Sequence, residues 1–141
     1  MAKTRRELID CVISKLGVLV PGQSPGDEVV SKVDSRIDPT VAMLIGIGIE
    51  IANIDVGTPN PPAGGQIDDV DFLSIADSVA WQSGGDFNMA DAPSLKTLAD
   101  EAEARLRIIH RPASTRQTLR ADLQLRGSQF RAPIGNFTRG T

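Results

Sequence analysis

The fold of this chain of 141 residues is decided by the stretch DDVDFLSIADSVAW, residues 68–81. Its apolar side chains recur at helical spacing but cover a wide arc, which predicts a central helix that is buried on most sides. Acidic residues at its start suit the positive end of a helix, and Gly84-Gly85 is expected to end it. The apolar residues are Val70, Phe72, Leu73, Ile75, Ala76, Val79, Ala80 and Trp81.

A helix with a capping box is predicted near the start of the chain. Thr4 and Glu7 stand three residues apart, so each side chain is placed to accept a hydrogen bond from the other residue's backbone N–H. Apolar residues at helical spacing follow, and Gly17 is expected to stop the helix. These apolar residues are Leu8, Ile9, Val12, Ile13 and Leu16.

A second helix is expected to open at Ser24-Pro25, because Ser is a preferred N-cap and Pro fits the first helical position. Asp38-Pro39 is expected to break this helix, or to restart it as a short helix through about Leu44. Its apolar face is formed by Val29, Val30, Val33 and Ile37.

The last helix is predicted over about residues 94–111, where a proline follows and prevents continuation. Two pairs of opposite charge, Glu101-Arg105 and Glu103-Arg107, stand four residues apart in the favourable order. The apolar stripe of this helix consists of Leu95, Leu98, Ala102, Leu106 and Ile109.

The middle of the chain alternates between apolar and other residues, which predicts a strand over about residues 47–54, with a bulge or bend near Asn53. The segment TPNPPAGG, residues 58–65, is expected to be a surface loop. The alternating residues are Ile45, Ile47, Ile49 and Ile51. The sequence therefore predicts a mainly α fold: a small bundle of about four helices with a short β segment near residues 47–54 and an extended C-terminal arm.

Composition limits the classes of function. The chain has one Cys and one His, which excludes a disulfide framework, a cysteine zinc cluster and a multi-histidine metal site. No apolar run approaches the ~20 residues that span a bilayer, and residues 1–20 lack a signal-peptide cleavage pattern. We therefore expect a soluble protein made inside the cell. Its core is expected to be aliphatic, because aromatic residues make up only 4% of the chain.

The candidate sites for chemistry have structural interpretations. Asp68, Asp69 and Asp71 suggest paired carboxylates or a metal site, but acids at a helix start also complement the helix dipole. Gly46-Ile47-Gly48 lacks the third glycine of a dinucleotide fingerprint, and no Walker A motif occurs. We therefore predict no enzyme activity, no cofactor and no metal site.

Three single residues are interpreted in the same way. His110 lies at a helix end, where a cation suits the dipole. Cys11 is expected to be a small, partly buried core residue. Trp81 is expected to pack in the core, with a role as an interface anchor as the alternative.

Charge divides the chain into two predicted domains. Residues 1–111 carry 10 basic and 17 acidic side chains, whereas residues 112–141 carry five Arg and one acid, Asp122. An acidic body with a basic tail suggests that the tail has its own partner. We predict a helical body over residues 1–111 and an extended basic docking arm over residues 112–141.

Apolar and polar residues alternate strictly over residues 119–126 of the arm, which favours a strand. A lone strand needs a sheet edge or a groove, in its own body or on another chain. A terminal strand or helix folded back on the body, and a disordered end, are the alternatives. The candidate docking residues are Arg116, Leu119, Arg120, Leu123, Leu125, Arg126, Phe130, Arg131 and Phe137.

Three segments near the start form a recognisable motif: Thr4–Ile9, Ile13–Leu19 and Gly22–Pro25. They describe a helix ending in basic–apolar–Gly–apolar, a short turn containing Gly, and a Ser that caps a second helix. This motif resembles the head-to-tail adaptor proteins of tailed bacteriophages, the head-completion or packaged-DNA-stabilisation family. The motif covers residues 4–38, and the order of elements is similar over residues 4–111.

The resemblance implies a virion structural protein that forms a ring, commonly of twelve copies, beneath the portal protein at the capsid vertex. Its partners would be the portal protein, copies of itself and a tail or nozzle protein. Packaged DNA would pass through the ring without sequence-specific binding. The protein would be made in the host cytoplasm and would end in the virion neck, with no membrane partner. The arm would dock on the portal, with its leucines in pockets and its arginines beside acids.

Two other functional classes stay open. A small nucleic-acid-binding protein would use the basic arm, and steep salt-dependent binding to duplex DNA would support that function. A regulatory domain or enzyme subunit would use the arm to dock on its partner, and co-purification with a non-structural protein would support it.

Overall fold

The computed structural model describes residues 1–89 and 92–111. Within these residues the chain forms four α-helices, one short 3-10 helix and a two-stranded antiparallel sheet. The mainly α class predicted from the sequence is confirmed. The helices are α1 (Arg5–Leu16), α2 (Asp27–Gly46), α3 (Asp69–Ser83) and α4 (Pro93–Ile109), with the 3-10 helix η1 (Gly84–Phe87) after α3. The strands are β1 (Ala2–Lys3) and β2 (Ile67–Asp68).

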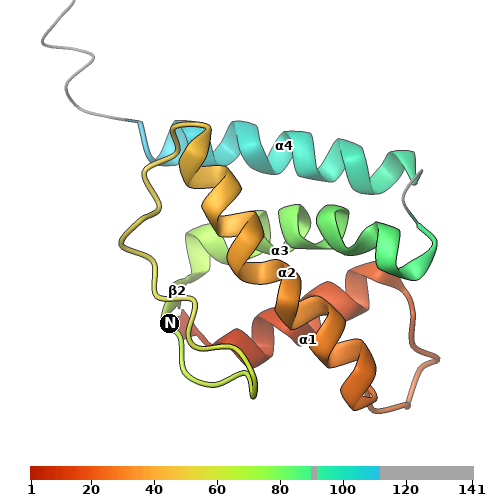
Figure 1. Ribbon diagram of the computed structural model, residues 1–141. Coiled ribbons are helices and arrows are strands. Elements are labelled where there is room, and N and C mark those ends of the chain that lie inside the picture. Colours follow the sequence, from red (N-terminus) through yellow and green to blue (C-terminus); the bar gives the residue numbers. More distant parts are fainter. Residues whose placement is uncertain (90–91, 112–141) are drawn as a thin grey trace, which may run out of the picture. The chain divides into compact units, whose positions relative to one another are not determined.

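Helix α3 is the central element, as its wide apolar arc predicts. It lies between α4 on one side and α1 on the other, and α2 packs across it (Figure 1). Most of its side chains are buried, including Phe72, Ile75 and Val79. Of its apolar residues, Val70 and Leu73 are 59% and 53% exposed, so one side of α3 stays open, consistent with a helix buried on most sides.

Helix α1 follows the sequence signals at both ends. The Thr4 hydroxyl accepts a hydrogen bond from the Glu7 N–H, and the Glu7 carboxylate accepts one from the Thr4 N–H at 2.8 Å. Gly17 ends the helix in the left-handed region, with a φ of 64° that costs glycine little. The predicted capping box and glycine stop are therefore confirmed.

The capping box makes stability depend on pH. The hydrogen bond from the Thr4 N–H lowers the pKa of Glu7 below its usual 4.5. Because the folded pKa is depressed, the stabilisation is fully present above the unfolded value and is lost as pH falls through the folded value. We expect Glu7→Gln to show a smaller drop in Tm between about pH 6 and about pH 3 than the natural chain. Thermal melts followed by circular dichroism test this, with the exposed Glu50→Gln as control. Equal pH dependence in the natural chain and Glu7→Gln would contradict it.

Helix α2 is longer than predicted and starts later. Its N-cap is Gly26, not Ser24, and acids in its first turn, Asp27 and Glu28, suit the helix dipole without a side-chain cap. Pro39 lies inside the helix and does not break it. The buried face continues in phase across Pro39, from Ile37 to Thr40 and beyond, so packing on both sides offsets the lost hydrogen bond.

The predicted strand over residues 47–54 is wrong. Ile47 is the C-cap of α2, Gly48 has a φ of 91°, and the following backbone hydrogen bonds are local, such as Ile49 N–H to the Leu44 carbonyl. Ile49 and Ile51 are buried while Ile45 and Ile47 are exposed. The alternation in the sequence therefore reflects one helix end and a buried turn, and no strand pairs with this segment among residues 1–89 and 92–111.

Residues 58–65 form the predicted loop, closed by a bridge between Thr58 and Ala63.

Two groups of buried apolar residues hold the described part together. The larger unites α1, α2 and α3 with Ile67 and Leu95, and partly buried Trp81 packs against it, as expected for a core residue. The smaller joins the end of α2 to the following turn and α4; it contains Val41, Leu44, Ile49, Ile51 and Leu106.

Candidate interaction surfaces

The predicted docking arm, residues 112–141, lies outside the described residues. All nine of its candidate residues, from Arg116 to Phe137, are therefore still predictions.

In the part of the chain that the structure describes, no group of His, Cys, Asp and Glu side chains is placed to hold a metal ion. Among the same residues, no helix is both long and apolar enough to cross a membrane.

The acidic start of α3 contains one contact that the sequence did not indicate. Nε2 of His110 lies 2.8 Å from Oδ1 of Asp71, whose side chain is 7% exposed. This contact ties the end of α4 to the start of α3, across 39 positions of sequence. Asp69, by contrast, pairs with the amino terminus of the chain at 2.8 Å. Both acids therefore make structural contacts, and His110 does more than suit a helix dipole.

Cys11 is partly buried on α1, as expected. Burial raises the pKa of its thiol, which reduces the thiolate fraction at neutral pH. Nearby, Nζ of Lys15 lies 2.7 Å from Oδ1 of the buried Asp77 on α3. These residues join α1 to α3 and do not form an activated nucleophile.

A buried ionic cluster around Arg5 fixes the long connection between α2 and α3. The Arg5 side chain is 0% exposed; its Nε donates to Oδ1 of Asp34, and its terminal nitrogens donate to both carboxylate oxygens of Asp38. It also donates to the Val56 carbonyl at 3.2 Å, and the Asn60 N–H donates to Oδ2 of Asp34. Burial alone would lower the pKa of Arg5, but the hydrogen bonds to Asp38 and Asp34 outweigh it and raise the pKa. Sequence reasoning missed this cluster, because its members come from three separate segments.

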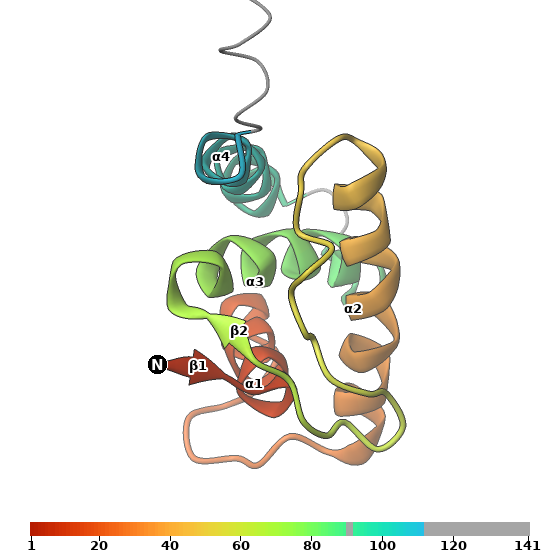
Figure 2. The ribbon, with the colours of Figure 1, turned by 90° about the vertical axis from the view of Figure 1, so that its left-hand side faces the viewer.

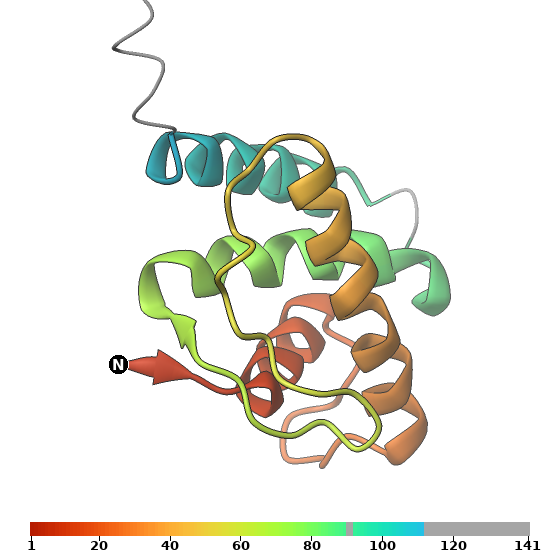
Figure 3. The ribbon, with the colours of Figure 1, turned by 60° about the vertical axis from the view of Figure 1, so that its left-hand side comes forward.

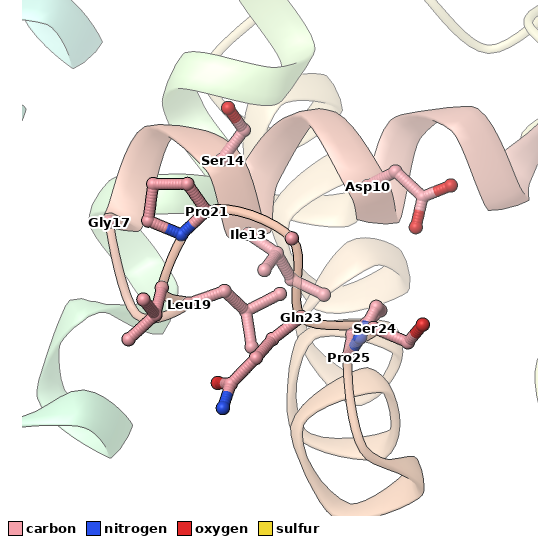
Figure 4. A pocket seen from close by; sticks show the side chains of 11 residues that line it. Asp10, Ile13, Ser14, Gly17, Leu19, Pro21, Gln23, Ser24 and Pro25 are labelled. Carbon is pink, nitrogen blue, oxygen red and sulfur yellow. The ribbon is translucent and has the colours of Figure 1, made fainter.

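One exposed apolar surface lies at the α1–α2 connection. A hollow of about 550 Å³ opens between the end of α1 and the segment from Gly17 to Pro25, and Ile13 and Leu19 both line it (Figure 4). Val18 and Val20 of the same segment are 37% and 64% exposed. We call this hollow, together with the exposed Val18 and Val20, the loop surface.

A second exposed apolar surface lies at the other end of α2. Ile45 and Ile47 are 41% and 38% exposed, and a hollow of about 430 Å³ lined by Ile45 and Ile49 opens here. We call this the helix-end surface. The loop surface adjoins the start of α2, and the helix-end surface lies at its other end (Figure 1). A helix of 20 residues is about 30 Å long, so this length of helix separates the two surfaces.

Comparison of the chain with protein-family models, with curated proteins and with solved structures found no match. The function is therefore inferred from the residues of this chain.

Proposed function

We propose that this protein is a virion structural protein: a ring-forming adaptor that connects the portal at the capsid vertex to the tail and extends the DNA channel. It has no enzyme activity. The observation that carries the proposal is the pair of apolar surfaces at opposite ends of α2. A closed ring of identical subunits uses two different patches on each subunit, and the loop surface and the helix-end surface supply them.

The local structure of the motif supports the same function. The residues that resemble the adaptor family form a capped helix and a glycine stop, followed by a connection into a second helix whose N-cap is Gly26 instead of the Ser of the motif. The ten basic and 17 acidic side chains of residues 1–111 give the ring an acidic character. Binding to phosphates grows with the number of Lys and Arg engaged, so packaged DNA passes such a ring with little attraction.

The arm supplies attachment to the portal. Leu119, Leu123 and Leu125 fill portal pockets, and the arginines of the arm meet portal acids. The described helices already pack on one another through two groups of buried apolar residues, so the body is expected to fold without the arm. Removal of the arm therefore tests attachment separately from folding.

We expect Leu119→Ser/Leu123→Ser/Leu125→Ser to weaken portal binding by about a thousandfold, because three buried leucines contribute ~1.5 kcal/mol or more each. The tagged full-length chain, this triple variant and a chain ending at Arg111 are each incubated with lysate of the producing cells. Only the full-length chain should retain the portal protein. Asp122→Ser/Gln124→Ser, on the other side of the alternation, is the matched control and should bind normally. Equal retention of the portal by the triple variant would contradict the role of the arm, and capture of nucleic acid would favour a nucleic-acid-binding function.

A further inference from the structure

Helix α4 is the outermost helix of the described residues. Its buried residues are Leu95, Ala102 and Leu106; Leu95 belongs to the larger core group and Leu106 to the smaller one. One flank of α4 faces the end of α2, where Ala99 and Glu103 share a small hollow with Met43. No other described element covers the opposite flank, as the view along the axis of α4 shows (Figure 2). The same free side of α4 is visible from a second direction (Figure 3).

Four residues form one line along this free flank: Leu98, Glu101, Arg105 and Ile108. Their spacing of three, four and three residues places them on one side of a helix, about a quarter turn from the buried side. Leu98 and Ile108 are 36% and 75% exposed. The side chains of Glu101 and Arg105 are 57% and 50% exposed and pair with each other at 3.2 Å. We call these four residues the α4 stripe.

The α4 stripe is complementary to itself. Its order is apolar, acidic, basic, apolar, and its positions are symmetric about residue 103. A second α4 that runs antiparallel, related by a two-fold axis at residue 103, places Leu98 opposite Ile108 of the second copy. The same axis places Glu101 opposite Arg105 of the second copy, and the contact repeats on the other side of the axis. The spacing of three and four is also that of the contact seam between two packed helices.

We propose that the α4 stripe binds the α4 stripe of a second copy, so that the free protein pairs as a two-fold antiparallel dimer. Charge complementarity selects the occupant and its direction. A parallel arrangement sets Glu101 against Glu101 and Arg105 against Arg105, which is repulsive. The antiparallel arrangement sets each acid against a base and each exposed aliphatic residue against another. The stripe is separate from the loop surface and the helix-end surface, so this dimer does not depend on the proposed ring.

The test uses the full-length protein and sedimentation equilibrium over a wide range of concentration. The natural chain should reversibly reach the mass of a dimer. Glu101→Arg sets two arginines of one copy against two of the other, and Arg105→Glu does the same with acids. Each single variant should weaken dimerisation by more than about a hundredfold, because like charges across an interface cost several kcal/mol. Circular dichroism confirms that each variant keeps its helix content.

Mixing the two single variants gives the decisive result. A Glu101→Arg chain carries two arginines in its stripe and an Arg105→Glu chain carries two acids, so the equimolar mixture should form heterodimers. Glu28→Arg is the matched control, because Glu28 also pairs with a base four residues on, Lys32, but lies on α2. It should leave dimerisation unchanged. The proposal is overturned if the natural chain stays monomeric, if the single variants associate like the natural chain, or if the mixture stays monomeric.

Discussion

Replacing Arg5 with Met is expected to lower the free energy of unfolding by roughly 3–5 kcal/mol, the usual cost of removing one partner from a buried ion pair. The side chain of Asp34 is 5% exposed, so its carboxylate would remain buried without its cation. A single domain is stable by only about 5–15 kcal/mol, so this substitution removes a large fraction of the total.

The substitution also releases the connection between α2 and α3. Arg5 donates a hydrogen bond to the Val56 carbonyl, and Asp34 accepts one from the Asn60 N–H. Both hydrogen bonds to the connection therefore depend on the Arg5–Asp34 ion pair. Urea unfolding measures the effect, with Arg6→Met as control, because Arg6 is the exposed neighbour on the same helix. Arg5→Met/Asp34→Asn should be less destabilised than Arg5→Met, since the stranded charge is gone. If Arg5→Met lowered the free energy of unfolding no more than Arg6→Met does, the cluster would not stabilise the fold.

Replacing Ile51 with Ala is expected to lower the free energy of unfolding by about 2–5 kcal/mol, because it opens a cavity in the smaller core group. Ile51 is 1% exposed and belongs to the group that joins α2, the following turn and Leu106 of α4. Its loss therefore loosens α4 as well as the turn. Hydrogen exchange should report faster opening of α4 than of α1.

Ile47→Ala provides the matched control for this prediction. It removes the same atoms from the same segment, but Ile47 is 38% exposed and belongs to neither core group. We expect its effect to stay below about 1 kcal/mol. If Ile51→Ala and Ile47→Ala lowered the free energy of unfolding equally, residues 47–54 would not pack as the structure shows.

The helices could be predicted from the sequence because their signals are local. The Thr4 capping box, the Gly17 stop and the wide apolar arc of α3 each lie within a few residues of the structure they specify. Boundaries were less secure: Ser24 had the residue type of an N-cap, but the helix began after Gly26. Tertiary packing keeps α2 continuous through Pro39, and the residues next to Pro39 do not predict that packing.

The errors and omissions share a physical cause. The alternation of isoleucines with other residues from Ile45 to Ile51 indicates a segment with an apolar side and a second side. A strand is only one of the structures that have two such sides. The Arg5–Asp34 and Asp71–His110 contacts join residues 29 and 39 positions apart, and no spacing rule links such residues. The β1–β2 pair is also long-range, with only two residues in each strand. The arm residues lie outside the described part, so their role rests on the alternation in the sequence.

Weighing the complex with a purified portal ring by native mass spectrometry tests the adaptor function most directly. The full-length chain should add to the portal in a fixed number of copies that forms a closed ring, and the chain ending at Arg111 should add none. A portal that gains no mass, or that gains the same mass from the truncated chain, would contradict the proposed function and the role of its arm.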